Sequence, residues 1–247
     1  MRSSKYEDGC VLNCLYSLIK STGYQVGNNK CFIDYYGNKY LVDREARYFI
    51  KIPWEYSGEL EFKDTDSLDS YYYDERYVVR DMSNFPHAGN GYVYTGIWFK
   101  LNDDEIYDAG QRKVALHVLL GSLYDFQDLE SLINAGLENN IDKIVINHKD
   151  NNPLNNNRDN LEWCFQQDNV IHSRVIQKIH ALCRDELNVP KYTYNTGINN
   201  RLALTGINIS VKDILEFKKL KGIYCSNFNY KEFINWVFEK QNIVDRV

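Results

Sequence analysis

Residues 145–169, VINHKDNNPLNNNRDNLEWCFQQDN, constrain the fold of this chain more than any other segment. An apolar, strand-like run ends at Asn147 and His148, and a second such run, LEWCF, follows a long polar loop. The loop is rich in asparagine and contains Pro153, and both residue types favour turns over strands and helices. A segment with helical periodicity begins after LEWCF. The sequence therefore predicts a ββα unit made of a strand, a loop, a partner strand and a helix.

The asparagines of this unit have two explanations. Asn, Tyr, Lys and Ile are frequent throughout the chain, as in proteins from AT-rich genes, so many asparagines are expected to be plain loop residues. The asparagines interpreted in this way are Asn151, Asn152, Asn155, Asn156 and Asn157. Three others have more specific positions: Asn147 ends the first strand, Asn160 starts the second, and Asn169 lies near the start of the helix. Folding the unit is expected to bring these three positions together around His148.

The words VINHKDNN, NNNRDNLEW and QQDN resemble the HNH nuclease family, in particular the ββα-metal domain of phage intron homing endonucleases. Two upstream segments, GYVYTGIWFK and VALHVLLGSLY, are similar to the hairpin and helix of those enzymes, with Val118 where the family usually has arginine. The resemblance extends over about residues 91–175. It implies an HNH ββα-metal nuclease domain at 91–187. Residues 1–90 and 188–247 resemble no family, and their strand and helix patterns predict an N-terminal α/β region of unknown role at 1–90 and a helical C-terminal subdomain at 188–247. The fold expected for the whole chain is therefore α+β.

The resemblance implies a divalent-metal-dependent endonuclease that hydrolyses phosphodiester bonds of double-stranded DNA by a one-metal mechanism. His148 matches the general base, and an imidazole pKa of about 6.5 suits proton transfer near neutral pH. Asn160 matches an asparagine that braces the loop near the catalytic histidine. Asn147 and Asn169 match the metal ligands, and their amide oxygens suit a hard cation such as Mg²⁺ or Mn²⁺.

Two neutral amides bring no charge to a metal ion, so we expect the free protein to bind Mg²⁺ weakly. The scissile phosphate would supply much of the affinity, as at magnesium sites that use substrate oxygens. On this basis Asn147→Asp, which adds a charged ligand oxygen, should preserve or raise activity at low Mg²⁺.

Other polar residues near the unit have alternative roles. His172 is either a further metal or phosphate contact or a partly exposed surface histidine. His117 either packs beneath the site or reaches a phosphate. Arg174 and Lys178 follow on the same helix, where they either contact the DNA backbone or form a solvated surface. Asp150 is expected to brace the loop rather than to bind metal, and the remaining histidines, His87 and His180, are expected to take no part.

The charge of the chain is unevenly distributed. The net charge is −5 in total. Residues 1–110 hold 12 Lys and Arg against 18 Asp and Glu, whereas residues 111–247 hold 17 against 16. Phosphate binding depends on basic residues, so a DNA-binding surface belongs in the second half. The acidic first half suits contacts with proteins, including a homo-oligomer. A restriction or phage-defence nuclease is therefore an alternative to a homing enzyme, and a catalytically degenerate HNH-fold protein that binds DNA or a partner is an alternative outside enzymes.

Composition also bears on location and on metals. The sequence has no run of about 18 apolar residues, so no membrane span is expected, and the first residues lack the apolar core of a signal peptide. We therefore expect an intracellular protein, in the cytoplasm of a bacterium or of a phage-infected host. Of the six cysteines only Cys10 and Cys14 are close, followed by Cys31, and no second pair completes a zinc site. Free thiols are expected.

Periodicity predicts the other elements. Residues 8–22 are expected to form a helix, and residues 24–100 several short strands, with a hairpin in 91–109 that turns at NDD. Further helices are expected at 114–124, 126–140, 166–187, 211–221 and 231–240. The apolar face of the helix at 166–187 is expected to contain Val170, Val175, Ile179 and Leu182. Ser210 and Gly222 should cap the helix at 211–221. The C-terminal helices are expected to pack or dock, with contact to DNA as an alternative.

Overall fold

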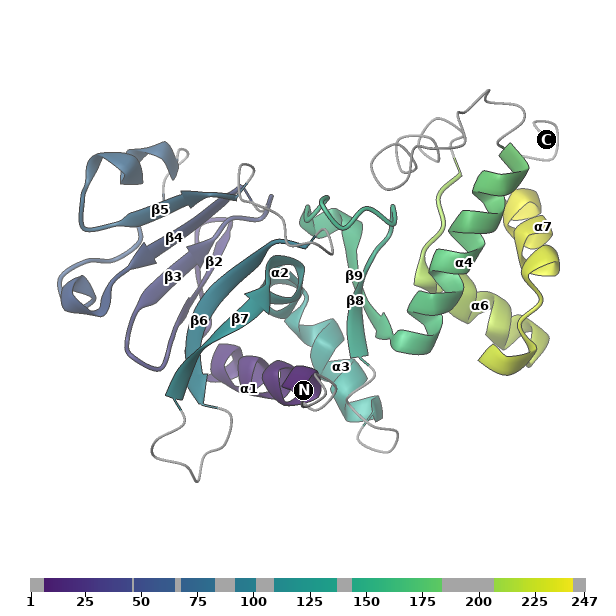
Figure 1. Cartoon of the computed structure of the whole chain (residues 1–247), viewed down its shortest axis with the longest axis horizontal. Coiled ribbons are helices and arrows are strands. Elements are labelled where there is room, and N and C mark those ends of the chain that lie inside the picture. The colour runs from purple at the N-terminus through teal and green to yellow at the C-terminus, as the bar shows by residue number, and fades with distance from the viewer. Residues whose placement is uncertain are drawn as a thin grey trace, which may run out of the picture. The chain divides into compact units, whose positions relative to one another are not determined.

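The chain has a mixed α and β fold, seen here in a computed structural model (Figure 1). The structure describes residues 7–45, 47–64, 68–82, 92–100, 109–136, 144–183 and 207–241. Contacts divide the chain into two compact units. The first consists of Met1–Asp142 and Asn156–Leu161, and the second of Lys143–Asn155 and Glu162–Val247. The boundary thus falls inside the nuclease domain predicted at 91–187, because the predicted hairpin and helices before residue 142 pack within the first unit.

The first unit is built on an antiparallel five-stranded sheet in sequence order. Its strands are β1 (Tyr24–Val26), β2 (Asn29–Ile33), β3 (Lys39–Val42), β4 (Tyr48–Ile52) and β5 (Val78–Asp81). Each strand pairs with the strand that follows it in the sequence, as expected for neighbouring segments of the chain. Short 3-10 helices, η1 (Trp54–Tyr56) and η2 (Leu68–Tyr73), lie between β4 and β5.

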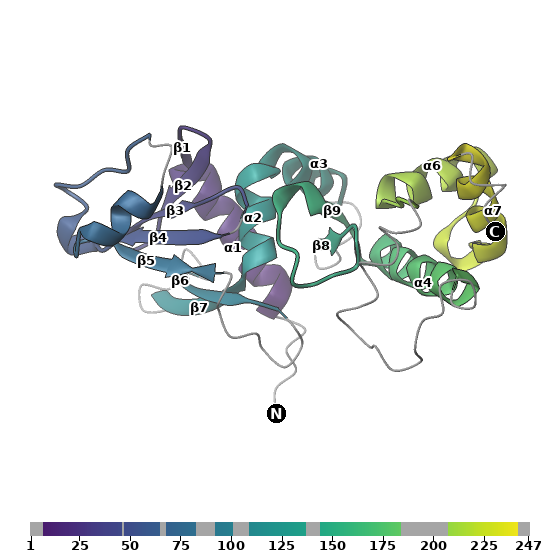
Figure 2. The ribbon, with the colours of Figure 1, turned by 90° about the horizontal axis from the view of Figure 1, so that it is seen from above.

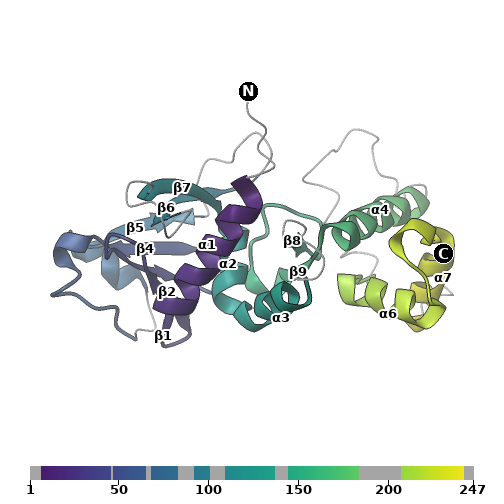
Figure 3. The ribbon, with the colours of Figure 1, turned by 90° about the horizontal axis from the view of Figure 1, so that it is seen from below.

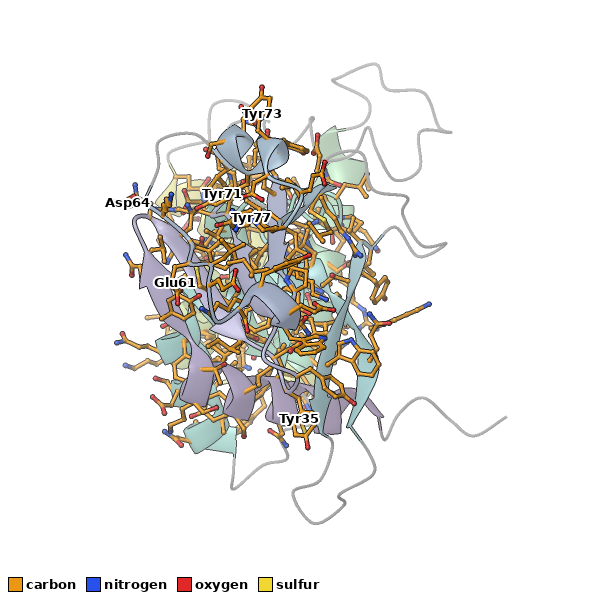
Figure 4. The ribbon with its side chains drawn as sticks, turned by 90° about the vertical axis from the view of Figure 1, so that its left-hand side faces the viewer. Tyr35, Glu61, Asp64, Tyr71, Tyr73 and Tyr77 are labelled. Carbon is orange, nitrogen blue, oxygen red and sulfur yellow. The ribbon has the colours of Figure 1, made fainter. Side chains whose placement is uncertain are left out.

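Successive side chains of the central strands point to opposite faces of the sheet, and apolar side chains cover both faces. One set packs with Phe62 and Tyr71, and it comprises Cys31, Leu41, Ile50 and Ile52. On the alternate positions the Phe32 and Tyr40 rings stack with centroids 4.9 Å apart. Figure 4 shows Tyr71 and Tyr77, whose ring centroids are 4.8 Å apart, and Tyr73 at the end of η2, which is largely exposed.

Three helices and a hairpin complete the first unit. They are α1 (Glu7–Thr22), β6 (Tyr94–Lys100), β7 (Ala109–Ala115), α2 (Leu116–Tyr124) and α3 (Phe126–Gly136). Helix α1 lies beside α2 and contacts β2 and β6 (Figures 2 and 3). The hydroxyl of Tyr124 donates to the Val42 carbonyl and accepts from the Lys30 amide, which ties α2 to the sheet.

The second unit combines a strand pair with a helical bundle. Strand β8 (Ile144–His148) pairs with β9 (Leu161–Phe165), and a 3-10 turn, η5 (Arg158–Asn160), precedes β9. The helices are α4 (Gln166–Cys183), α6 (Val211–Lys221) and α7 (Tyr230–Lys240), with the 3-10 turn η6 (Cys225–Asn227) between the last two. The bundle core is rich in aromatic rings, and Phe217 packs edge-on against Phe228 and Phe233.

Most predicted elements are confirmed, with local corrections. The helix predicted at 114–124 begins only at Leu116, because Val114 and Ala115 complete the ladder of β7 with β6. Helix α6 matches its prediction, including the Ser210–Asp213 capping box and Gly222 at a φ of 63°. On α4, Val175 and Ile179 are buried as predicted, but Val170 is exposed and Ile171 takes its place in the core.

Some predictions concern residues that the structure does not describe. They are the NDD turn of the hairpin, the ends of the helices predicted at 126–140 and 166–187, the side chains of Leu182 and His180, and His87. Within the described part of the chain, no helix is both long and apolar enough to cross a membrane.

Candidate functional site

The predicted site begins at the end of β8, where two consecutive polar residues are buried. Asn147 is 3% exposed and His148 is 6% exposed. Strand β8 has buried isoleucines at Ile144 and Ile146, so hydrophobic packing continues to the position just before the polar pair. Burial of polar groups is costly unless they form hydrogen bonds. The chemistry available at the end of β8 therefore depends on the hydrogen-bond partners of Asn147 and His148.

Asn147 is held by a buried carboxylate that the sequence interpretation missed. Its side-chain Nδ2 donates to Glu162 Oε1 over 2.8 Å, and Glu162 is 9% exposed. An ionised carboxylate can only accept hydrogen bonds, so the amide must turn its NH₂ group toward Glu162. The carbonyl oxygen Oδ1 of Asn147 is then the atom that the amide can offer to a cation.

Glu162 also holds the start of α6. The backbone amide of Val211, the first residue of that helix, donates to the same Oε1 atom over 2.9 Å. Alternation along LEWCF places Leu161, Trp163 and Phe165 on one face of the strand. In the structure Glu162 and Cys164 are buried as well, so β9 is covered on both faces at these positions. Glu162 is the glutamate of NLEW in the sequence. Its burial is apparent only from the packing of the C-terminal helices.

The loop after β8 is organised by short-range hydrogen bonds of its polar side chains. Asp150 Oδ1 accepts from the Asn152 backbone amide, and Asp150 Oδ2 accepts from Asn155 Nδ2. The Asn152 side chain in turn accepts from the Leu154 amide, and Asn151 adopts a left-handed φ of 58°. The prediction that Asp150 braces the loop is confirmed. The asparagines here are loop residues, as expected, and three of them have specific structural roles.

The end of the loop belongs to the first unit, and Asn160 lies there. Asn157 caps η5 by accepting from the Asp159 amide, and the Asn160 amide donates to the Asn157 carbonyl. Arg158 forms an ion pair of 2.7 Å with Asp125 at the end of α2. This segment is therefore anchored to the helix that carries His117. The predicted role of Asn160, to brace the loop near His148, stays a prediction.

Asn169 lies in the first turn of α4, which packs against β8 within the second unit. The neighbouring Asp168 is buried and forms an ion pair of 2.9 Å with Lys218 of α6. Asn147, His148 and Asn169 thus share one unit, on two elements that contact each other. Asn160 belongs to the other unit, and the predicted grouping of all three asparagines around His148 stays a prediction.

The surface position considered for His172 is wrong, because its side chain is completely buried. Its Nε2 lies 3.0 Å from the Ile209 carbonyl, which can only accept, so Nε2 carries the proton. Among the described residues Nδ1 has no hydrogen-bond partner. Burial lowers the pKa of His172, with partial opposition from the bond to Ile209. The imidazole is therefore a neutral part of the core between α4 and the segment before α6.

His117 is buried on α2, with its ring 4.8 Å from the ring of Tyr92. His117 thus packs within the first unit, and both roles considered for it, beneath the site or at a phosphate, stay predictions. Arg174 and Lys178 are exposed on α4, as both of their interpretations require. Arg174 donates to the Tyr230 hydroxyl over 3.4 Å, and Lys178 Nζ lies 5.4 Å from the centre of the Tyr230 ring.

Hard cations such as Mg²⁺ prefer oxygen ligands. Asn147 has an amide oxygen whose orientation is set by Glu162, and Asn169, in the first turn of α4, carries a second amide group. Among the described residues no group of three or more His, Cys, Asp or Glu side chains could hold a metal ion. The thiols of Cys31, Cys164 and Cys225 are free, as predicted. Burial raises the pKa of the Cys31 thiol to about 12, so it is a neutral core residue.

Comparison of the chain with protein-family models, with curated proteins and with solved structures gave no match.

Proposed function

We propose that this protein is a divalent-metal-dependent DNA endonuclease of the HNH class. The observation that carries the proposal is the end of β8, where an amide of fixed orientation, Asn147, stands next to a buried histidine, His148, on a strand packed against α4. The residue order and types agree with the resemblance in the sequence. Homing, restriction and phage-associated roles all use this chemistry.

In the proposed mechanism His148 accepts a proton from the attacking water. An imidazole can do this near neutral pH because its pKa is ordinarily about 6.5. Asn147 and Asn169 would hold Mg²⁺ or Mn²⁺ through their amide oxygens, and the ion would supply positive charge at the scissile phosphate. Asn160 braces the loop. Exposed basic residues of α4, Arg174 and Lys178, contact the DNA backbone and orient the duplex.

A second candidate is a DNA-binding or interaction protein with an inactive HNH fold. One observation favours it: both proposed ligands are neutral, and neutral donors bind a divalent ion less tightly than carboxylates do. The acidic first half of the chain, with exposed aromatic residues such as Trp54 and Tyr73, also suits contact with a protein.

A plasmid assay tests the proposal. Wild-type protein is incubated with supercoiled plasmids that contain diverse sequences, in Mg²⁺ or Mn²⁺ and in chelator. We expect metal-dependent nicking or linearisation, with a loss of about 10²–10⁴-fold in rate for His148→Ala because the general base is removed. His87→Ala, the same substitution at a histidine that the sequence predicts to take no part, should cut like the wild type.

Two outcomes contradict the nuclease proposal. Cleavage that survives in purified His148→Ala would assign the activity to other residues or to a contaminant. Intact DNA with every plasmid, together with a metal-independent shift of DNA in a gel, would favour the inactive DNA-binding protein.

A further inference from the structure

We propose that Glu162 is the positioning residue of the metal site: it aims the Asn147 carbonyl oxygen at the cation and supplies the negative charge that the two amide ligands lack. The inference rests on the proposed nuclease function and identifies a residue that the resemblance does not assign.

The first step concerns orientation. The terminal atoms of an asparagine can be exchanged by a half-turn of the amide, so an unconstrained Asn147 would present NH₂ to a cation in part of the molecules. The 2.8 Å bond from Nδ2 to Glu162 Oε1 removes this freedom, because a carboxylate accepts and cannot donate. Both side chains are buried, so water competes little for the bond. Glu162 thus prepares Asn147 as an oxygen donor before any metal arrives.

The second step concerns charge. Among the described residues, Glu162 Oε1 accepts from the Asn147 amide and the Val211 backbone amide, and neither group carries a formal charge. The negative charge of the buried carboxylate would therefore act on a cation bound by Asn147. Carboxylates that hydrogen-bond to metal-binding side chains commonly orient those ligands and strengthen them as donors, and removing one costs about 10–100-fold in metal affinity or activity.

Glu162 has a structural role that must be separated from this one. The helix macrodipole favours negative charge at the start of α6, where Glu162 meets Val211. Asp213 supports the same helix end, since its Oδ2 accepts from the Ser210 backbone amide at 2.9 Å, but its carboxylate is held by Ser210 and Lys240. Asp213→Asn therefore removes a carboxylate from the start of α6 and leaves the Asn147–Glu162 contact in place.

The contact also revises the outcome expected for Asn147→Asp. An aspartate at position 147 has no NH₂ group, so two carboxylates would meet where the structure has one donor and one acceptor. Two like charges at this distance repel each other. We now expect Asn147→Asp to destabilise the protein.

The test measures Mn²⁺ binding rather than cleavage. Every protein carries His148→Ala, so that the DNA stays intact, and is mixed with plasmid-derived duplex DNA that the wild type cleaves. Free Mn²⁺ is followed by electron paramagnetic resonance. We expect Glu162→Gln to weaken Mn²⁺ binding about 10-fold, although its amide oxygen can still accept from Asn147 and Val211. Asp213→Asn should match the parent.

Each possible result either supports or overturns the role proposed for Glu162. Unchanged Mn²⁺ binding by Glu162→Gln in a protein whose wild-type form cuts DNA would overturn the inference and leave the nuclease function standing. Equal weakening by Glu162→Gln and Asp213→Asn would assign the effect to the anchoring of α6, and this also overturns it. Absence of both cleavage and Mn²⁺ binding in the wild-type chain would remove the proposed function and this inference with it. Thermal unfolding of each variant confirms that the proteins compared are folded.

Discussion

At the scale of single residues, the polar loop after β8 gives similar side chains different roles. Asn151 supplies a left-handed backbone conformation, Asn152 accepts from the Leu154 amide, and Asn155 donates to Asp150. Asn147, the same residue type at the end of β8, is a buried donor to Glu162. Composition explains why asparagine is abundant in the chain, whereas backbone conformation and burial explain what each one does.

The conformation of Asn151 leads to a residue-scale prediction. At a φ of 58° a residue with a β-carbon is strained by about 1–2 kcal/mol, and Asn and Gly tolerate this region best. We expect Asn151→Gly to change the free energy of unfolding by a few tenths of a kcal/mol, and Asn151→Ala to lower it by about 1 kcal/mol. Urea denaturation followed by circular dichroism measures both. Equal stability of the two variants would contradict the positive φ.

At the scale of elements, α4 connects the predicted site to the C-terminal helices. One face buries Ile171, Val175, Ile176 and Ile179 in the bundle core, and the same face contains His172. The exposed face carries Arg174 and Lys178 beside Tyr230. A single helix therefore takes part in the core, in the proposed metal site through Asn169, and in the proposed DNA contact.

The buried His172 predicts how pH affects this element. Burial lowers its pKa below the ordinary 6.5, so the unfolded chain binds the proton more readily than the folded chain does. The stability from neutral His172 is complete above pH 6.5 and declines as pH falls below that value toward the folded-state pKa. The carboxylates that act on this imidazole, Glu162, Asp213 and Asp150, moderate the decline.

The measurement compares wild type with His172→Gln, which keeps an N–H donor for Ile209 and does not titrate. Free energies of unfolding are determined by urea denaturation between pH 7.5 and pH 5. We expect the wild-type values to fall more steeply with acid than those of the variant. Parallel curves would show that His172 does not titrate differently in the two states.

At the scale of the whole molecule, the chain forms two units with separate cores. The core of the five-stranded sheet includes Cys31, Leu41 and Ile50, and the helical core of the second unit centres on Phe217. The chain passes from the first unit to the second and back, since the segment Asn156–Leu161 belongs to the first unit. The proposed base His148 and the proposed metal ligands Asn147 and Asn169 lie in the second unit, whereas Asn160 and the acidic residues 1–110 lie in the first.

This division predicts a localised response to a core mutation. Phe217 is fully buried among aromatic rings, and replacing such a residue with alanine costs about 3–5 kcal/mol. We expect Phe217→Ala to reduce amide hydrogen-exchange protection in α4, α6 and α7, while β2, β3 and β4 keep theirs. Ile50→Ala, in the sheet core, should give the reverse pattern. Loss of protection in both units with either variant would show that they unfold as one.

The local features of the fold could be predicted from the sequence alone. Helix α6 was predicted with its caps because Ser210, Asp213 and Gly222 act on the backbone within a few residues. The order of β8, loop, β9 and α4 followed in the same way, since hydrophobic periodicity and turn residues are local signals. The resemblance to HNH nucleases over this unit singled out Asn147, His148 and Asn169 as candidates, and turn chemistry predicted Asp150 as a loop brace.

Tertiary structure alone decided which polar residues are buried. Alternation along LEWCF gave no reason to bury Glu162, whose second partner, Val211, lies 49 residues away. Nor did the helical pattern of α4 bury His172, which is bonded to Ile209, 37 residues away. Periodicity assigns a residue to a face of its own element, whereas burial depends on what a distant segment places against that face. The orientation of Asn147, and with it the proposed metal site, was therefore decided by contacts that no local pattern contains.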